Sequence, residues 1–366
     1  MKTKTLLLLA LVMLTQIALP AGNAGAEKSK KTKGPKNIIL MIGDGMGAAQ
    51  LYAGITALRD NTNIYRCPVS GFVKTLSADE YITDSAAGAT AYSTGYKTNN
   101  GYLGVTPDGA PKKTILEMAE TKGLSTGLVV TAAITHATPA AFYAHLNVRD
   151  NYEEIARHIL NSGVDVFIGG GWNHFTKRSD GKNFADSLVK RNYVLARNIG
   201  DIEKATSTKL AGFLSDEQLP RYSEGRGDML PVSTAKAIEL LSENDKGFFL
   251  MVEGSQIDWG GHANDLNYIV EEVVDFDKAI GKALDFAMKD GETLVIITAD
   301  HETGGMAITG GDMKQGKVEA RFTYGDHSAV MVPLFAFGPG AEKFSGLQDN
   351  TDIFWKCVEL QKLGDK

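Results

Sequence analysis

The sequence has little cysteine and no long apolar run beyond its first residues. Its only two cysteines, Cys67 and Cys357, lie far apart, and one pair is too few for a disulfide framework. We expect two free, partly buried thiols, although export would permit a disulfide between them. No stretch after Leu19 is long and apolar enough to cross a membrane. No internal repeat or low-complexity block follows Lys36. These absences indicate an ordinary globular protein.

The sequence also lacks an excess of basic residues. Lys and Arg number 38 against 44 Asp and Glu, which gives a formal net charge of -6. Loss of the first 26 residues would remove Lys2 and Lys4 and change the charge to -8, from 36 basic and 44 acidic residues. A mildly acidic protein is a poor candidate for general nucleic-acid binding. The composition, with 43% hydrophobic residues, is that of an ordinary globular protein, and about 340 mature residues can bury a large core as one sizeable domain or two.

The first 26 residues have the pattern of a secretory signal peptide. Two lysines precede the apolar run Leu6–Leu19, which is too short to span a bilayer comfortably, and Ala24–Ala26 is a small-residue cleavage site. The alternative is an uncleaved membrane anchor. We do not expect a lipoprotein anchor, because no Cys follows the apolar run to carry a lipid. We expect a flexible basic lead-in over Glu27–Lys36. The mature protein, with a domain over 37–366, is then secreted or periplasmic, without a membrane anchor.

Short apolar, β-branched runs alternate with helical patterns along the chain. The expected strands are 37–42, 128–131, 166–168, 248–252, 294–298 and 332–337, with weaker candidates at 193–196 and 210–214. The clearest amphipathic helix is 268–288, and the others are 114–121, 152–160 and 234–241. Such strands and helices predict an α/β fold, a three-layer sandwich with a central, mostly parallel β-sheet flanked by helices.

Four of these runs lead into residues of the types that bind metals. The residues are Asp44 after 37–42, His136 and Thr138 after 128–131, Glu253, Asp258 and His262 after 248–252, and Asp300 and His301 after 294–298. Ligands of open parallel sheets bind at the carboxyl ends of the strands. Singly, each residue has a plain structural explanation, such as a turn cap or a surface pair at i and i+4. Their coincidence at one edge favours a metal centre.

Zinc accepts imidazole nitrogen and carboxylate oxygen, and two zinc ions can stabilise both oxygens of an in-line displacement at phosphorus. We therefore assign one ion to Asp258, His262 and His327 and a second to Asp44, Asp300 and His301. His327 is included only because a catalytic zinc usually has three protein ligands. Glu253 and Thr138 offer hard oxygens to a third, magnesium-like site, which Asp44 could bridge to the second ion. His145, His158 and His174 lack such settings, and we expect them to be structural or surface residues.

The stretch Tyr81–Gly95 places a hydroxyl, Ser85, after Asp84 and before a run of very small residues. This pattern indicates a helix N-terminus, where free N–H groups and the helix dipole favour an anion. A metal against Ser85 would lower its hydroxyl pKa and favour nucleophilic attack. The structural alternative is a capped helix packed through Ala and Gly. Arg149 is the candidate clamp for two phosphate oxygens, and its alternative is an ion pair with Asp150 or Glu153.

In this order the motifs resemble those of the alkaline phosphatases, the secreted bacterial members in particular, from Asn37 to about Pro339. Asn37–Gly47 is similar to the family's opening motif, Thr83–Ala91 to its nucleophile motif and Thr298–Gly305 to its second zinc segment. The resemblance implies two zinc ions, one magnesium ion and a homodimer. It also implies that Ser85, itself a metal ligand, takes the phosphoryl group of a phosphate monoester as phosphoserine. Water then releases inorganic phosphate.

The sequence departs from the family pattern at two site positions. Some bacterial members carry an acid where His136 stands and a Lys where Trp259 stands. His136 would reach the magnesium site as a nitrogen donor or through water, and Trp259 would face substrate without a charge. The segment 304–326 is short where larger relatives insert a crown subdomain, so we expect a compact, crown-type insertion here.

Other enzymes of the superfamily share much of this metal constellation. The sequence at Cys67 lacks the Cys-x-Pro-x-Arg pattern of sulfatases. Ser rather than Thr as nucleophile, with Arg149 available, favours a monoester over a diester. A metal-dependent phosphodiesterase or another superfamily phosphotransferase stays open, as does a non-catalytic zinc- or phosphate-binding protein. Ser85 distinguishes an enzyme from a protein that only binds zinc or phosphate, because a binding protein needs no nucleophile between metals.

Overall fold

The computed structural model describes residues 34–364. The predicted signal peptide and most of the lead-in therefore lie outside the described residues. Ten strands form one sheet in the order β14-β2-β13-β8-β1-β7-β3-β4-β6-β5. Their bounds are β1 (Asn37–Gly43), β2 (Val69–Lys74), β3 (Ser125–Ala133), β4 (Val166–Gly170), β5 (Val194–Ala196), β6 (Leu210–Phe213), β7 (Phe248–Gly254), β8 (Thr293–Thr298), β13 (Val332–Phe337) and β14 (Gly346–Asp349). Strand β13 pairs antiparallel with both neighbours, and the other pairs in this sheet are parallel.

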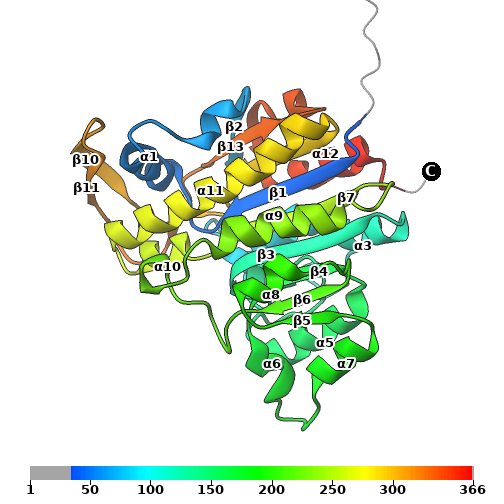
Figure 1. Ribbon diagram of the computed structural model, residues 1–366. Coiled ribbons are helices and arrows are strands. Elements are labelled where there is room, and N and C mark those ends of the chain that lie inside the picture. Colours follow the sequence, from blue (N-terminus) through cyan, green and yellow to red (C-terminus); the bar gives the residue numbers. More distant parts are fainter. Residues whose placement is uncertain (1–33, 365–366) are drawn as a thin grey trace, which may run out of the picture. The chain divides into compact units, whose positions relative to one another are not determined.

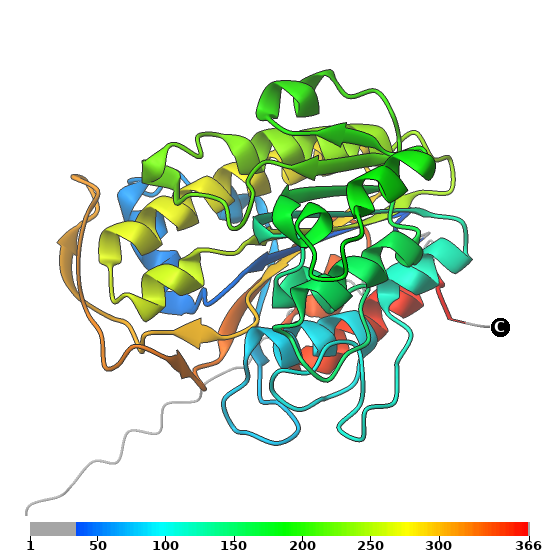
Figure 2. The same ribbon diagram turned by 90° about the horizontal axis from the view of Figure 1, so that it is seen from below.

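Helices cover both faces of the sheet, as predicted. Their bounds are α1 (Ala48–Ala57), α2 (Ser85–Thr94), α3 (Ile115–Thr121), α4 (Ala137–Ala140), α5 (Tyr152–Ser162), α6 (Trp172–Thr176), α7 (Phe184–Lys190), α8 (Ile199–Lys204), α9 (Met229–Leu241), α10 (Ile257–His262), α11 (Leu266–Asp290) and α12 (Asn350–Gln361). Helices α9 and α11 pack together across one face (Figure 1). Helices α2 and α12 pack together on the opposite side of the sheet (Figure 2).

The central strands and the longest helix form for the reasons that the sequence suggests. Every residue of β1 is buried, because β7 and β8 flank it and helices cover it. Helix α11 begins where the Asp265 side chain accepts hydrogen bonds from two backbone N–H groups, and it ends at Gly291 with φ 69°. Its apolar face includes Phe276, which is 1% exposed. Truncation of such a side chain to Ala typically costs about 3–5 kcal/mol of stability.

Two strands of the sheet, β2 and β14, were not predicted. Strand β2 contains Gly71 and leaves Phe72 exposed, and only Val73 of its six residues is buried, so it lacks the continuous apolar run of a central strand. Strand β14 has only four residues. Both lie at the sheet's edge beyond β13, and β2 pairs with both β13 and β14. Tertiary pairing rather than local pattern therefore specifies them.

Four further strands connect the end of β8 with β13. They are β9 (Glu302–Thr303), β10 (Ala307–Asp312), β11 (Lys317–Arg321) and β12 (His327–Ser328). Strands β10 and β11 form an antiparallel hairpin, and β9 pairs with β12 at its base. The hairpin lies beside α1 (Figure 1).

The two cysteines are free, as expected. Cys357 is buried and Cys67 is partly buried, and burial raises the pKa of each thiol to about 12. Within residues 34–364, no helix is both long and apolar enough to span a bilayer.

Candidate metal centre and active site

Four neighbouring strands, β8, β1, β7 and β3, deliver polar side chains to one edge of the sheet. Asp44 follows β1, Glu253 is the next-to-last residue of β7, and the pair Asp300 and His301 follows β8. His136 comes after β3 and precedes the short helix α4. Asp44, Glu253, Asp300 and His301 have no exposed surface. Charged groups buried so completely need a counter-charge or a metal.

The first carboxylate-imidazole group contains Asp258, His262 and His327. Asp258 and His262 lie four residues apart on α10, so both project from one face of the helix. His262 Nε2 lies 3.4 Å from Asp258 Oδ2 and 3.2 Å from His327 Nε2. The contact with Asp258 raises the pKa of His262 to about 9. The structure thus brings together the three residues that the sequence assigns to one ion.

The second group contains Asp44, Asp258 and His301, so Asp258 belongs to both groups. Asp300 lies close as well, because its Oδ2 atom is 3.5 Å from His301 Nε2. The same nitrogen lies 3.4 Å from Asp44 Oδ1 and 3.3 Å from Ser85 Oγ. Burial lowers the pKa of His301. The arrangement therefore presents a neutral imidazole nitrogen to two carboxylates and a hydroxyl.

The third group contains Asp44, His136 and Glu253, and Asp44 links it to the second. Thr138 Oγ1 lies 3.4 Å from Asp44 Oδ2. Burial lowers the pKa of His136 to about 3, so this imidazole is neutral. Trp259 lies beside the group, with its ring edge-on to His136 at a centroid distance of 6.1 Å.

Several buried ligand-type atoms make no hydrogen bond within the described residues, and this favours bound cations. They are Asp44 Oδ1, Asp300 Oδ2, both Glu253 carboxylate oxygens and His136 Nδ1. Burial and the nearby Asp258 raise the pKa of Asp300 to about 7, and burial with the charge of Asp300 raises that of Glu253 to about 8. Carboxylates that repel one another in a dry site fit divalent ions, and the oxygen-rich third group fits a hard ion.

Ser85 is the first residue of α2, and its neighbour Asp84 forms the N-cap. Asp84 Oδ1 accepts a hydrogen bond from Ala87 N at 2.9 Å. Farther along the helix, a Cβ atom on Gly88 would lie only 3.2 Å from Asp300 Cβ. The small residues thus agree with the structural alternative for this stretch, a capped helix packed through Ala and Gly, because they let α2 approach the Asp300 segment closely. They also hold the Ser85 hydroxyl against His301.

Arg149 does not pair with Asp150 or Glu153, which was the alternative left open by the sequence. Its Nη1 atom donates to Asp84 Oδ2 at 2.8 Å. The same carboxylate oxygen accepts from Gly101 N at 2.9 Å. Asp84 therefore both caps α2 and holds the guanidinium beside the helix start. This guanidinium is the group that the sequence predicts to bind two phosphate oxygens.

His145, four residues before Arg149, has a structural role with a testable pH dependence. Its Nδ1 atom lies 2.8 Å from Gly104 O and its Nε2 atom 3.0 Å from Glu117 Oε1, so only the imidazolium can donate to both acceptors. Burial alone would lower the pKa of His145, but the bonds to Glu117 and Gly104 outweigh it and raise the pKa. The ring of His158 lies edge-on at 6.2 Å.

We expect the replacement His145→Gln to destabilise metal-replete protein by about 1–2 kcal/mol at pH 6 and by less at pH 9. A raised folded-state pKa contributes stability below the unfolded pKa, about 6.5, and that stability disappears as pH rises through the folded value. Urea unfolding of both proteins at the two pH values measures this. An equal difference at pH 6 and pH 9 would show that the charge on His145 contributes nothing.

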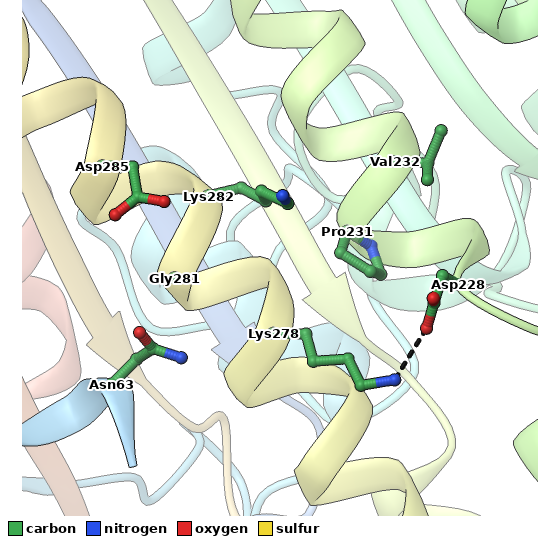
Figure 3. Close-up of a pocket in the computed structure, with 8 residues that line it drawn as sticks. All are labelled: Asn63, Asp228, Pro231, Val232, Lys278, Gly281, Lys282 and Asp285. Atoms are coloured by element: carbon green, nitrogen blue, oxygen red, sulfur yellow. Dashed lines mark hydrogen bonds and ion pairs between the residues drawn. The ribbon is translucent and has the colours of Figure 1, made fainter. Parts of the chain in front are cut away.

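A groove of about 380 Å³ lies elsewhere, between α9, α11 and the 3-10 turn at Asn63–Arg66. Figure 3 shows Lys278 reaching Asp228 across it, at 2.6 Å between Nζ and Oδ1. Its lining residues include none of the members of the three metal-type groups. The groove is therefore separate from the catalytic candidates.

Sequence reasoning missed the residues that support the ligands. Thr303 Oγ1 donates to Asp258 Oδ1 at 2.5 Å and lies 3.2 Å from His301 Nδ1, so it joins two of the groups. Glu302 and Ser328 also contact each other beside these ligands. Glu302 directly follows His301, and Ser328 directly follows His327, but nothing in the sequence showed that the two segments pair. Such partners orient ligands and tune metal binding.

Comparison with known proteins agrees with the geometry. The family model for alkaline phosphatase matches residues 35–320. Alkaline phosphatase 3 of Bacillus subtilis (strain 168) is 32% identical, with 98% of each chain covered. Alkaline phosphatase of Escherichia coli (strain K12) is 35% identical, with 91% of this chain and 87% of that protein covered.

Solved structures show the same relationship. Alkaline phosphatase from the Antarctic bacterium TAB5 has a TM-score of 0.87 and is 42% identical, with 92% of this chain and all of that chain covered. A variant of that enzyme, in which aspartate replaces a histidine, has been solved with magnesium in its M3 site. From its motifs, its fold and these relatives, the chain belongs to the alkaline phosphatase family, whose members are phosphomonoester hydrolases.

Proposed function

We propose that this protein hydrolyses phosphate monoesters through a phosphoserine on Ser85, at a site for two zinc ions and one magnesium ion. The position of Ser85 carries the proposal. Its Oγ lies 3.3 Å from His301 Nε2, at the N-terminus of α2 and beside three overlapping ligand groups. A protein that only bound zinc or phosphate would need no buried hydroxyl at this point.

The proposed ligand sets follow the three groups, except that Ser85 and Asp300, which both lie near His301 Nε2, replace the shared Asp258 at the second ion. Asp258, His262 and His327 hold one zinc ion, and Asp44, Ser85, Asp300 and His301 hold the other. Asp44, Glu253 and Thr138 hold magnesium, with His136 as a nitrogen donor or acting through water. When bound, the ions supply Lewis-acid stabilisation of the attacking and leaving oxygens and lower the pKa of the Ser85 hydroxyl. The TAB5 variant that holds magnesium in its M3 site carries aspartate in place of a histidine, whereas the third group of this chain contains His136.

The protein's own groups then account for two displacements at phosphorus. The Ser85 hydroxyl gives its proton to solvent, and its oxygen attacks phosphorus. The bond between phosphorus and the ester oxygen breaks, and the alcohol leaves with a proton from solvent. Backbone N–H groups at the start of α2, together with the helix dipole, stabilise negative charge on the phosphoryl oxygens. Water next attacks phosphorus, which breaks the bond to Ser85 and releases inorganic phosphate. Trp259 faces the substrate without adding a charge.

Arg149 binds two phosphoryl oxygens in this proposal, and Asp84 keeps the guanidinium in place. We expect Arg149→Ala to lower kcat/KM for a phosphate monoester by about 10–100-fold, which corresponds to loss of a charge-assisted hydrogen bond. Arg149→Lys should recover little, because an ammonium group cannot bind two oxygens in one plane. Steady-state kinetics of both variants measure this, with Arg157→Ala, a half-buried arginine of α5 that pairs with Glu154, as the control. Unchanged kcat/KM in Arg149→Ala would remove the residue from the substrate site.

Release of p-nitrophenol from p-nitrophenyl phosphate at alkaline pH tests the function directly. Purified mature protein should turn over, lose activity with a chelator and recover it with zinc and magnesium. No turnover from folded, metal-replete protein would contradict the monoesterase. Diesters and sulfate esters would then test the runner-up enzymes, and equilibrium dialysis with zinc and phosphate would test a binding protein.

We also propose the cellular setting and assembly that the family suggests. Residues 1–26 act as a signal peptide, the mature protein is secreted or periplasmic, and 37–366 is one domain. The hairpin of β10 and β11 lies within 304–326, where larger relatives carry a crown. A homodimer follows from family analogy, and light scattering of the mature protein tests it.

A further inference from the structure

Glu302 is a buried carboxylate to which the proposed reaction assigns no role. It is 3% exposed and directly follows His301. Its Oε1 atom accepts hydrogen bonds from Gln50 Nε2 at 2.6 Å and from Met306 N at 3.0 Å. Its Oε2 atom accepts from Gly305 N at 3.2 Å and from Ser328 Oγ. All four donors are neutral, so the carboxylate is held by hydrogen bonds alone.

These bonds join three separate parts of the chain. Gln50 lies in α1, and its Nε2 atom also donates to Thr303 O at 2.7 Å. Ser328 lies in β12, opposite Glu302 of β9, and His327 lies opposite Thr303. A Cβ atom on Gly47 would approach Glu302 Cγ to 2.3 Å, so the turn after Asp44 leaves room for Glu302 only because residue 47 is glycine.

This connection between β9 and β12 matters because His301, just before β9, and His327, in β12, belong to different metal groups. His301, just before β9, belongs to the group with Asp44, whereas His327 belongs to the group with His262. The two imidazole rings stack with a centroid distance of 3.6 Å. The ladder between β9 and β12 has only two residue pairs, and the β10–β11 hairpin extends from it beside α1 (Figure 1). So short a ladder needs side-chain ties to fix its register.

We propose that Glu302 is a positioning residue that, through Ser328, keeps His327 in register with His301 and thereby sets the spacing of the two metal groups. The inference rests on the proposed two-zinc site. The effect falls on the group with Asp258, His262 and His327. His262 has 38% of its side chain exposed, and the loop before His327 is exposed too. In the other group, Asp44 and Asp300 follow β1 and β8, and none of the four donors to Glu302 lies on either strand.

Zinc binding to the whole mature protein tests the proposal without reference to activity. Wild type, Glu302→Gln and Ser328→Ala are titrated against a competing zinc chelator, and bound zinc is counted. We expect one of the two zinc affinities to fall by about 10–100-fold in both variants, as is typical for the loss of a ligand's supporting partner, and the other to stay unchanged. Ser328→Thr keeps a hydroxyl and should restore the affinity. Ser345→Ala, which removes an exposed hydroxyl bonded to Glu342 O, is the matched control.

A second readout separates positioning from general support of the fold. The thermal midpoint of metal-free Ser328→Ala should fall by only a few degrees, as loss of one buried hydrogen bond explains, and excess zinc should restore its kcat. The proposal would be overturned if the variants bound zinc as tightly as wild type, if both of their zinc affinities fell equally, or if Ser345→Ala lost the same affinity. A wild type that binds fewer than two zinc ions would also overturn it. A wild type that binds two zinc ions but hydrolyses no phosphate ester would instead contradict the proposed function. The zinc titration would still decide the role of Glu302.

Discussion

Replacement of Ser85 by Ala is expected to abolish turnover while leaving the fold in place and the metals held by their remaining ligands. Loss of a nucleophile whose neighbouring groups act with it typically lowers kcat by 10⁴-fold or more, to order of magnitude. Ser85 is the first residue of α2, a position where Ala is tolerated, and its hydroxyl makes one contact, with His301 Nε2. Release of p-nitrophenol, with zinc content and circular dichroism measured on the same sample, separates lost chemistry from lost structure.

Ser93→Ala is the matched control for this experiment. Ser93 lies on the same helix and is buried, but its hydroxyl donates to Ala141 O, away from the ligand groups. It should therefore lose some stability and keep kcat. Substantial turnover in Ser85→Ala with full metal content would mean that water attacks the ester directly, and the phosphoserine pathway would have to be abandoned.

Metal removal is expected to destabilise the protein more at pH 9 than at pH 6. In the metal-free site, burial with the charge of Asp258 raises the pKa of Asp300 to about 7, and burial with that of Asp300 raises the pKa of Glu253 to about 8. Unfolded carboxyls titrate near 4. A raised carboxyl pKa contributes stability below the unfolded value, and that stability is lost as pH rises through the folded one. At pH 9 both groups are charged, buried and without a cation.

Thermal unfolding with and without a chelator at the two pH values measures this effect. Saturating metal contributes about 4 kcal/mol per site at a thousand times Kd, so the midpoint should fall by on the order of 10 °C. His262, with its pKa raised to about 9, acts in the same direction. Metal-free Glu253→Gln should depend less on pH than metal-free wild type, because an amide cannot ionise. A drop of equal size at pH 6 and pH 9 would contradict the electrostatic account of the site.

The sequence allowed the prediction of the sheet's central strands because burial on both faces produces continuous apolar runs. The run at β1 is one example, and β7 and β8 are others. The candidate ligands that follow these strands could be placed at one edge for the same reason, since parallel strands share a carboxyl end. Strand β2 could not be recognised, because its Gly71 and exposed Phe72 give no apolar pattern.

Long-range pairing was harder to predict. The partner of Arg149 lies 65 residues away at Asp84, whereas the local acids Asp150 and Glu153 were the alternatives that the sequence offered. The assignment of His327 rested on ligand number and on the family resemblance, and the structure places its Nε2 atom 3.2 Å from that of His262. The supporting contacts of Glu302 and Thr303 form across the two-residue ladder of β9 and β12, for which short segments give no periodic signal.

The most direct test of the central claim is to trap the phosphorylated enzyme. Mature, metal-replete protein is mixed with a labelled phosphate monoester, quenched in acid and digested, and the labelled peptide is identified by mass spectrometry. The account predicts one phosphate per active site, on Ser85, and none in Ser85→Ala or in metal-free protein. Label on another residue would contradict it. So would the absence of label in samples quenched throughout the first turnover, from an enzyme that turns over at the mixing temperature.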